Sequence, residues 1–221
     1  MAKPKIKKSK EEIVELCMAY LAQHGFDVSI ADICKAKKIK KSRFKAEFDS
    51  IEDFERFVWQ AMMRSAVETV YNDPQFSGFT KREKLLSIYY TFFENCGLNN
   101  EFLLRSVDHH GRSGMLSVLK ELKVDFVKFI ASIHQVSLPL GEQYGASINK
   151  LTDTVVGEAF YGQLLLLLDF WSKDKSADHE KTDIAIEKTV RASMDILDVT
   201  PVKSVIDFAK FFWQERVSKG I

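Results

Sequence analysis

Only four prolines and ten glycines interrupt the 221 residues, and this scarcity of helix breakers limits the fold of the chain more than any other feature. Proline and glycine are the residues that most disfavour helix interiors, so a chain with few of them can form long helices. Apolar residues recur at helical spacing, and no stretch alternates as a half-buried strand would. The sequence therefore predicts an all-α protein of about nine or ten helices.

Capping boxes mark several helix starts, because a Ser or Thr side chain can accept from the backbone three residues later while an acidic side chain there reaches back. The candidate boxes are Ser9 with Glu12, Ser29 with Asp32, and Thr80 with Glu83. The first four helices are expected from Ser9 to Gly25, from Ser29, from about Lys40 and from Ser50 to about residue 72. Thr80 opens a fifth, and further helices are expected over about 99–110, 113–136, 141–173, 178–197 and 201–217.

The net charge of +1 hides an asymmetry between the two ends of the chain. Residues 1–48 hold twelve Lys and Arg against six Asp and Glu, whereas the remainder holds twenty against twenty-five. Residues 1–10 are too basic and too poor in apolar side chains to pack, so they are expected to form a flexible arm. A basic head on an acidic body indicates a polyanionic partner at one end only.

Cysteine usage and hydropathy indicate a cytoplasmic protein that does not insert into a membrane. Cys17, Cys34 and Cys96 are scattered and odd in number, so they form neither a disulfide framework nor a metal-binding pair. The basic N-terminus lacks the apolar segment of a secretory signal. The most apolar run, Leu164 to Leu168, is far too short to span a bilayer.

Residues typical of catalytic or metal sites do not occur in a productive arrangement. His109 and His110 are adjacent, so on a helix they point about 100° apart and are poorly placed to bind one ion; a buried or pocket-lining role is the better interpretation. Residues 111–114 read Gly-Arg-Ser-Gly, which lacks the spacing and the preceding strand of a nucleophile elbow. With no phosphate-binding loop or dinucleotide motif, the sequence predicts no catalytic residue, metal or cofactor, and hence not an enzyme.

The third expected helix combines an apolar anchor with a cationic face. Phe44 and Phe48, four residues apart, would fix it to its neighbours and leave its basic side free to enter a DNA major groove. Ser29, at the start of the second helix, could offer its hydroxyl to a phosphate. The alternative is a solvated lysine-rich face with no partner. The candidate DNA-contacting residues are Ser29, Lys40, Lys41, Ser42, Arg43 and Lys45.

Residues 13–58 carry an ordered set of motifs. They are Ile13-Val14 with Leu21, Gly25-Phe26, Ser29-Ile30-Ala31-Asp32-Ile33, Phe44 with Phe48, and Ser50-Ile51-Glu52-Asp53-Phe54. In this order the set resembles the N-terminal helix-turn-helix domain of the TetR/AcrR family of transcriptional regulators. The resemblance implies a TetR-like fold, with a DNA-binding head over residues 11–50 and a helical body over 51–221 that binds a ligand and dimerises.

Four positions depart from the pattern of that family. Lys38 stands where the family has a turn glycine, so it would need a left-handed conformation or a different turn. Lys45 replaces a tyrosine that touches phosphate, Glu47 occupies a position often held by histidine, and Ile51 replaces a lysine. Lys38, Glu47 and Ile51 keep a second interpretation open: a TetR-fold accessory protein that carries a lipid or isoprenoid and no longer binds DNA.

Seventeen phenylalanines, many of them between residues 79 and 171, suggest a cavity in the body, although ordinary core packing explains any one of them. The resemblance implies a small apolar or aromatic effector there, and His109, His110 or Tyr161 would supply polar contacts. The candidate ligand-binding residues are Tyr89, Phe93, Phe102, His109, His110, Phe126, Phe160 and Tyr161.

Apolar faces over 153–171 and 178–197 are candidates for dimerisation, with burial inside the chain as the competing interpretation. The candidate interface residues are Val156, Phe160, Gln163, Leu164, Leu167, Ile186, Val190 and Met194. The leading functional hypothesis is a homodimeric repressor that binds a palindromic DNA operator and releases it when an effector occupies the body.

Overall fold

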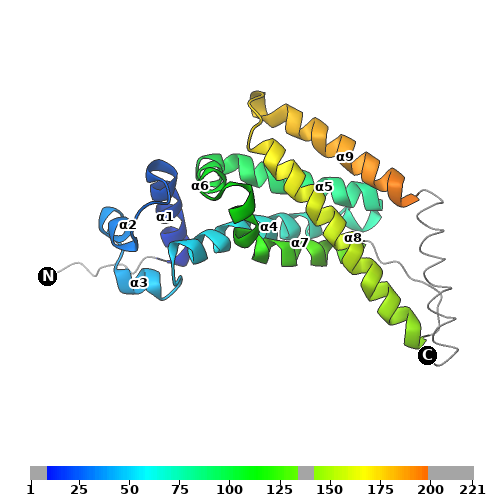
Figure 1. Ribbon diagram of the computed structural model, residues 1–221, viewed down its shortest axis with the longest axis horizontal. Helices are drawn as coiled ribbons and strands as arrows, with labels where there is room; N and C mark the ends of the chain where they lie inside the picture. The colour runs from blue at the N-terminus through cyan, green and yellow to red at the C-terminus, as the bar shows by residue number, and fades with distance from the viewer. Residues whose placement is uncertain (1–8, 134–141, 199–221) are drawn as a thin grey trace. The chain divides into compact units, whose positions relative to one another are not determined.

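The computed structural model describes the backbone of residues 9–133 and 142–198, and the side chains within 9–133 and 155–196. These residues form α-helices and two 3-10 helices without a strand, which confirms the predicted all-α fold (Figure 1). The expected helix over 201–217 lies outside the described residues. The elements are α1 (Lys10–His24), α2 (Ile30–Ala36), α3 (Lys41–Lys45), α4 (Ile51–Tyr71), η1 (Phe76–Gly78), α5 (Lys81–Leu98), α6 (Asn100–Val118), α7 (Lys120–Ile133), α8 (Glu142–Trp171), η2 (Ala177–His179) and α9 (Glu180–Asp198).

All three predicted capping boxes are present. The Ser9 hydroxyl accepts from the backbone N–H of Glu12 at 3.2 Å, while the Glu12 carboxylate accepts from the Ser9 backbone at 2.8 Å. The same reciprocal pattern opens α2 at Ser29 and precedes α5 at Thr80. Each box satisfies backbone donors that have no partner inside the helix, which is why these starts could be located from the sequence.

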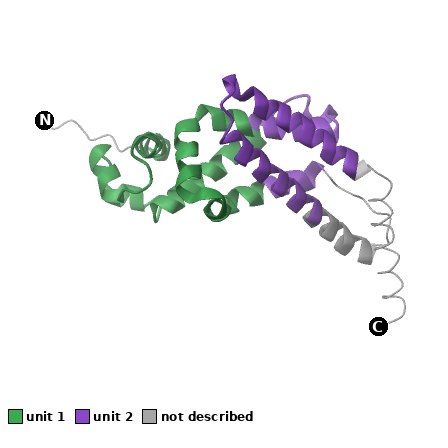
Figure 2. Cartoon of the chain, turned by 45° about the horizontal axis from the view of Figure 1, so that its top comes forward, with its two compact units in different colours: residues 1–68, 92–125 green, residues 69–91, 126–221 purple. Residues whose placement is uncertain are grey.

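The chain divides into two compact units, each built from two separate stretches of sequence (Figure 2). Unit 1 consists of residues 1–68 and 92–125, and unit 2 of residues 69–91 and 126–221. The predicted domain boundary after residue 50 lies within unit 1, which also includes residues 51–68 and 92–125.

Phenylalanine rings form the centre of the core beneath α3 in unit 1. Phe44, Phe48 and Phe54 are all buried, and their ring centroids lie between 5.1 and 6.2 Å apart. From α1, Ile13 and Leu21 add buried side chains on one helical stripe. Burying a large apolar side chain contributes roughly 1.5–3 kcal/mol, so these rings fix the five-residue helix α3, which is too short to be stable alone.

Helix α6, which packs against α1, contains the break that the sequence predicted between residues 110 and 113. The backbone at Gly111 leaves the helical conformation with a φ of 60°, which glycine adopts without the steric cost of a Cβ. A second boundary was not predicted. The expected helix over 113–136 is divided at Leu119, where α6 ends and α7 follows one residue later.

In unit 2, α8 packs against α9. Between them, Asp174 accepts hydrogen bonds from the backbone N–H and hydroxyl groups of Ser176 and Thr182 at 2.6–2.9 Å, which fixes the connection. No helix among the described residues is both long enough and apolar enough to cross a membrane.

Candidate nucleic-acid interface and the polar network behind it

The turn between α2 and α3 is closed by backbone hydrogen bonds and by one buried side chain. The Ile39 N–H donates to the Cys34 carbonyl at 2.9 Å, and the Ile39 side chain is 6% exposed. Lys38 adopts a φ of 52°, the left-handed conformation expected for a turn in which lysine replaces glycine. Since Ile39 points inward, the lysines on both sides of it are left at the surface.

Exposed lysines surround this turn. Lys35, Lys38, Lys40 and Lys41 are all exposed, and none of them has an ion-pair partner among the described residues. Phe44 is fully buried and holds α3 in place, while Ser42 on the same helix is exposed. Lysines that form no ion pair with the described side chains are thus concentrated at the turn and at the N-terminal end of α3.

The other predicted DNA-contacting residues already have partners within the chain. Arg43 Nη1 lies 2.7 Å from Glu47 Oε1, and the Lys45 ammonium donates to the backbone carbonyl of Asp49. The Ser29 hydroxyl donates to Asp32 at 2.6 Å. The hydrogen bonds from Ser29 hold the pKa of Asp32 below its usual value, so a carboxylate lies beside the hydroxyl that was expected to meet phosphate.

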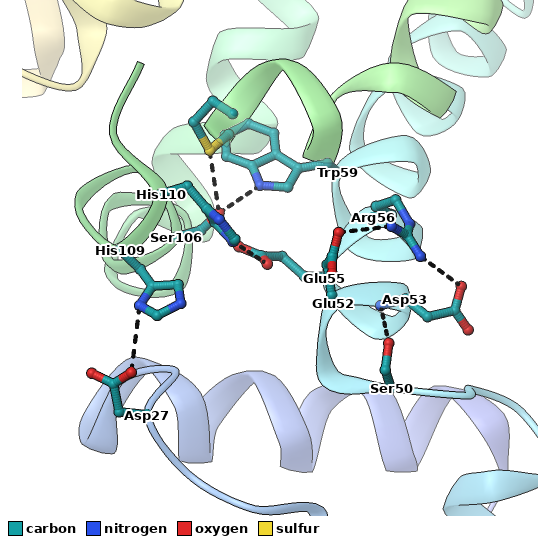
Figure 3. Close-up of polar contacts among 11 residues, drawn as sticks. Asp27, Ser50, Glu52, Asp53, Glu55, Arg56, Trp59, Ser106, His109 and His110 are labelled. Carbon is teal, nitrogen blue, oxygen red and sulfur yellow. Dashed lines mark hydrogen bonds and ion pairs between the residues drawn. The ribbon is translucent and has the colours of Figure 1, made fainter. Parts of the chain in front are cut away.

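Behind the head, a polar network joins α4 to α6 (Figure 3). His110 Nε2 lies 2.7 Å from Glu55 Oε2, and Glu55 is 1% exposed. Because a carboxylate only accepts, Nε2 is assigned as the protonated nitrogen. Beside this pair, Trp59 Nε1 donates to the Ser106 hydroxyl at 2.9 Å. Glu55 was not singled out from the sequence, although it precedes Trp59 by one helical turn and so shares its inward face.

The two adjacent histidines have different surroundings. His109 stacks on Phe26 with ring centroids 5.4 Å apart, and its Nδ1 lies 3.9 Å from the Asp27 carboxylate. Phe26 also contacts the ring of Phe102 at 5.5 Å. The described residues contain no group of three or more side chains placed to hold a metal. Through these ring contacts, three of the predicted ligand-binding residues meet in unit 1 next to the loop that joins α1 to α2: Phe102, His109 and His110.

A second group of the predicted ligand-binding residues meets in unit 2. The Tyr89 hydroxyl donates to the Phe160 carbonyl at 3.2 Å and to Gln163 Oε1 at 3.1 Å, and its ring lies 5.8 Å from that of Phe126. Gln163 is 8% exposed, and its Nε2 has no hydrogen-bond partner among the described residues. Burial raises the pKa of Tyr161 to about 12.

The eight predicted ligand-binding residues are divided between the two compact units. Phe93, Phe102, His109 and His110 belong to unit 1, whereas Tyr89, Phe126, Phe160 and Tyr161 belong to unit 2. The sequence suggested Gln163 for a dimer contact, and in the structure its Oε1 accepts a hydrogen bond from the Tyr89 hydroxyl.

Most of the predicted dimer-interface residues are buried within the chain itself. Phe160, Leu164, Leu167, Ile186 and Val190 are each at most 3% exposed, so in this conformation they offer almost no surface to a second copy. Val156 and Met194 are half-buried. For the buried residues, packing inside the chain, the competing interpretation, is what the structure shows.

The apolar side chains that α8 and α9 leave exposed are different ones. On α8, Val155, Leu166 and Phe170 are 60%, 71% and 43% exposed. With Ala159 and Gly162 they recur every three or four residues and form one stripe. On α9, Ile184 and Ile196 are 50% and 60% exposed.

Comparison with known proteins bears on the C-terminal part of the chain. Residues 84–212 match the family model of the tetracyclin repressor-like C-terminal domain, which covers more than half of the chain. No curated protein matches the chain. Together with the all-helical fold, this match shows that the chain belongs to the tetracyclin repressor-like family.

Proposed function

We propose that the chain is a transcriptional regulator that binds operator DNA through the α2–α3 region. The observation that supports this most directly is the group of exposed lysines Lys35, Lys38, Lys40 and Lys41 around the α2–α3 turn, which form no ion pair with any described residue. Cations without acidic partners attract a polyanion, and neutralising DNA phosphates releases counterions, which drives binding.

In the proposed complex, α3 lies in the major groove with its N-terminal end against the DNA. Phe44 anchors the helix from beneath, and Lys40, Lys41 and Ser42 project toward the DNA. Lysines so placed mainly contact phosphates, which fix position and affinity but carry little sequence information. Lys45 and Ser29 contribute less than the sequence suggested, because each already binds a group of its own chain.

A palindromic operator requires two copies of the head, and we propose that the exposed stripe on α8 joins them. A stripe that includes Leu166 and Phe170 is costly to leave in water, and the small residues Ala159 and Gly162 within it allow a second helix to approach closely. A second copy of this chain presents the same stripe, so the contact would be related by a two-fold axis.

We place the effector in unit 2, beside Tyr89 and Gln163. Gln163 Nε2 is a buried donor without a described partner, and leaving such a donor unsatisfied costs roughly 1–3 kcal/mol. An apolar or aromatic molecule with one hydrogen-bond acceptor would satisfy it. Binding of the effector would shift the protein toward conformations that bind DNA less well, and so lower the affinity for the operator.

The second candidate is a TetR-fold accessory protein that carries a lipid or isoprenoid and does not bind DNA. The specific observation in its favour is that Glu47 already neutralises Arg43, the side chain best suited to read a base. The two candidates differ in a property that can be measured directly, which is the salt-dependent affinity of the head for duplex DNA.

The test is the binding of the full chain to duplex DNA over a series of salt concentrations. Lys41→Ala should weaken binding to all sequences alike and reduce the slope of log affinity against log salt by about one. Lys128→Ala, at an exposed position of unit 2, is the matched control and should leave the slope unchanged. If the wild-type protein showed no salt-dependent binding to DNA, this result would favour the second candidate, the accessory protein.

A further inference from the structure

Arg43 differs from the lysines around the turn because its guanidinium forms an ion pair within the chain and is mostly buried. Its side chain is 28% exposed, and Nη1 lies 2.7 Å from Glu47 Oε1. Its Nε is buried and has no hydrogen-bond partner among the described residues. Glu47 follows Arg43 by four residues, so the two side chains meet on the same side of α3 and the turn that follows it.

A second cation holds the same carboxylate from the other side. Lys10 Nζ lies 3.7 Å from Glu47 Oε2, and it also lies over the ring of Phe57 at 4.3 Å from the centroid and over that of Phe48 at 5.3 Å. Two aromatic faces and a carboxylate are a favourable environment for an ammonium group. Lys10 begins α1, so the carboxylate of Glu47 is fixed between α1 and α3.

These contacts determine what Arg43 can do at a DNA surface. Its Nη1 is held by Glu47 in a charge-assisted hydrogen bond, and the Glu47 side chain is itself only 19% exposed. Moving the guanidinium outward to a phosphate would break this contact. The carboxylate would then face the incoming phosphate with Lys10 as its remaining partner, and like charges repel. Lys40 and Lys41 face no such cost, because neither has an acidic partner in the described part of the chain.

We infer that Glu47 is a positioning residue that keeps Arg43 out of contact with DNA, so that the lysines of the turn carry the wild-type affinity. The inference rests on the proposed function, and it reverses the role that the sequence suggested for Arg43. A consequence is that neutralising Glu47 adds a phosphate contact, because it releases Arg43.

The test is the affinity of Glu47→Gln for one fixed DNA duplex, measured by fluorescence anisotropy between 50 and 200 mM salt. One additional phosphate contact makes the salt slope steeper by about 0.9, so the ratio of variant to wild-type affinity should change about threefold across this range. Asp49→Asn is the matched control. It removes an exposed carboxylate two residues away that pairs with no cation among the described residues, and it should leave the slope unchanged.

Arg43→Ala, made in the wild-type and in the Glu47→Gln background, separates the release of Arg43 from a general effect of charge. In the wild type it should change the slope by less than about 0.3, and in the Glu47→Gln background it should abolish the gain. A gain that persists without Arg43 overturns the inference. So does a loss of about one slope unit for Arg43→Ala alone, because Arg43 would then already touch DNA.

The same series distinguishes this inference from the proposed function. If the wild type binds duplex DNA and Lys41→Ala reduces its slope, the proposed function stands whatever Glu47→Gln does. If the wild type shows no salt-dependent binding, the proposed function and this inference both fail. Circular dichroism of each variant shows whether the helices are retained, so that a loss of binding through unfolding is recognised.

Discussion

Replacing His110 by alanine should destabilise unit 1, because it leaves a buried carboxylate without a hydrogen bond. Glu55 is 1% exposed, its Oε2 binds His110 Nε2 at 2.7 Å, and its Oε1 has no partner among the described residues. Breaking a fully buried pair costs roughly 3–5 kcal/mol. The His110 side chain is 20% exposed, so water can partly replace it, and we expect a loss of about 2–3 kcal/mol.

Urea unfolding, followed by circular dichroism and by tryptophan fluorescence, measures this loss. Agreement between the two signals establishes that one transition is being analysed. His109→Ala is the matched control: its partner Asp27 is fully solvated at 3.9 Å, so the loss should stay below about 1 kcal/mol, mostly from stacking on Phe26.

A double-mutant cycle with Glu55→Gln assigns the effect to the pair. Glutamine retains an acceptor but removes the charge, so His110→Ala should cost at least about 1.5 kcal/mol less in that background. A loss below about 0.5 kcal/mol for His110→Ala, or equal losses in both backgrounds, would refute the argument that the imidazole stabilises a buried charge.

Two further predictions concern unit 2. Burial acts to raise the pKa of Asp174, but its hydrogen bonds from Ser176 and Thr182 outweigh burial and hold the pKa well below the ordinary value of 3.8. Because the folded-state pKa of Asp174 is lowered, its carboxylate stabilises the fold above pH 3.8, and this stabilisation is lost as the pH falls below that value. Asp174→Asn should therefore flatten the decline in stability between about pH 4 and pH 2, and an unchanged decline would contradict this prediction. Leu166→Glu should produce monomers of nearly unchanged stability because Leu166 is 71% exposed, whereas Leu164→Glu should unfold the chain because Leu164 is 1% exposed. Sedimentation that shows a wild-type monomer at micromolar concentration would contradict the dimer.

The local parts of the fold could be predicted from the sequence. The capping boxes at Ser9, Ser29 and Thr80 depend on residues three positions apart, so the sequence contains all the information they need. The break at Gly111 is equally local. The boundary at Leu119 was missed because no proline or glycine marks it, and helical periodicity continues across it.

The partners of buried polar groups could not be predicted in the same way. Glu55 and His110 are 55 residues apart, and Tyr89 and Gln163 are 74 apart, so their pairing depends on how the helices pack. An apolar helical face likewise does not reveal whether its own chain or a second copy covers it, which is why buried residues such as Leu164 were assigned to a dimer contact. The pairing of Arg43 with Glu47 was within reach, since four residues separate them.

Recognition of an operator by this protein, which is what we claim, can be tested by a mobility-shift titration with DNA from upstream of its own gene. We expect one discrete complex that contains two copies of the chain. Its affinity should exceed that for unrelated DNA of the same length roughly 10³-fold or more at the same salt. Equal binding to both DNAs, or no complex with either, would contradict the claim.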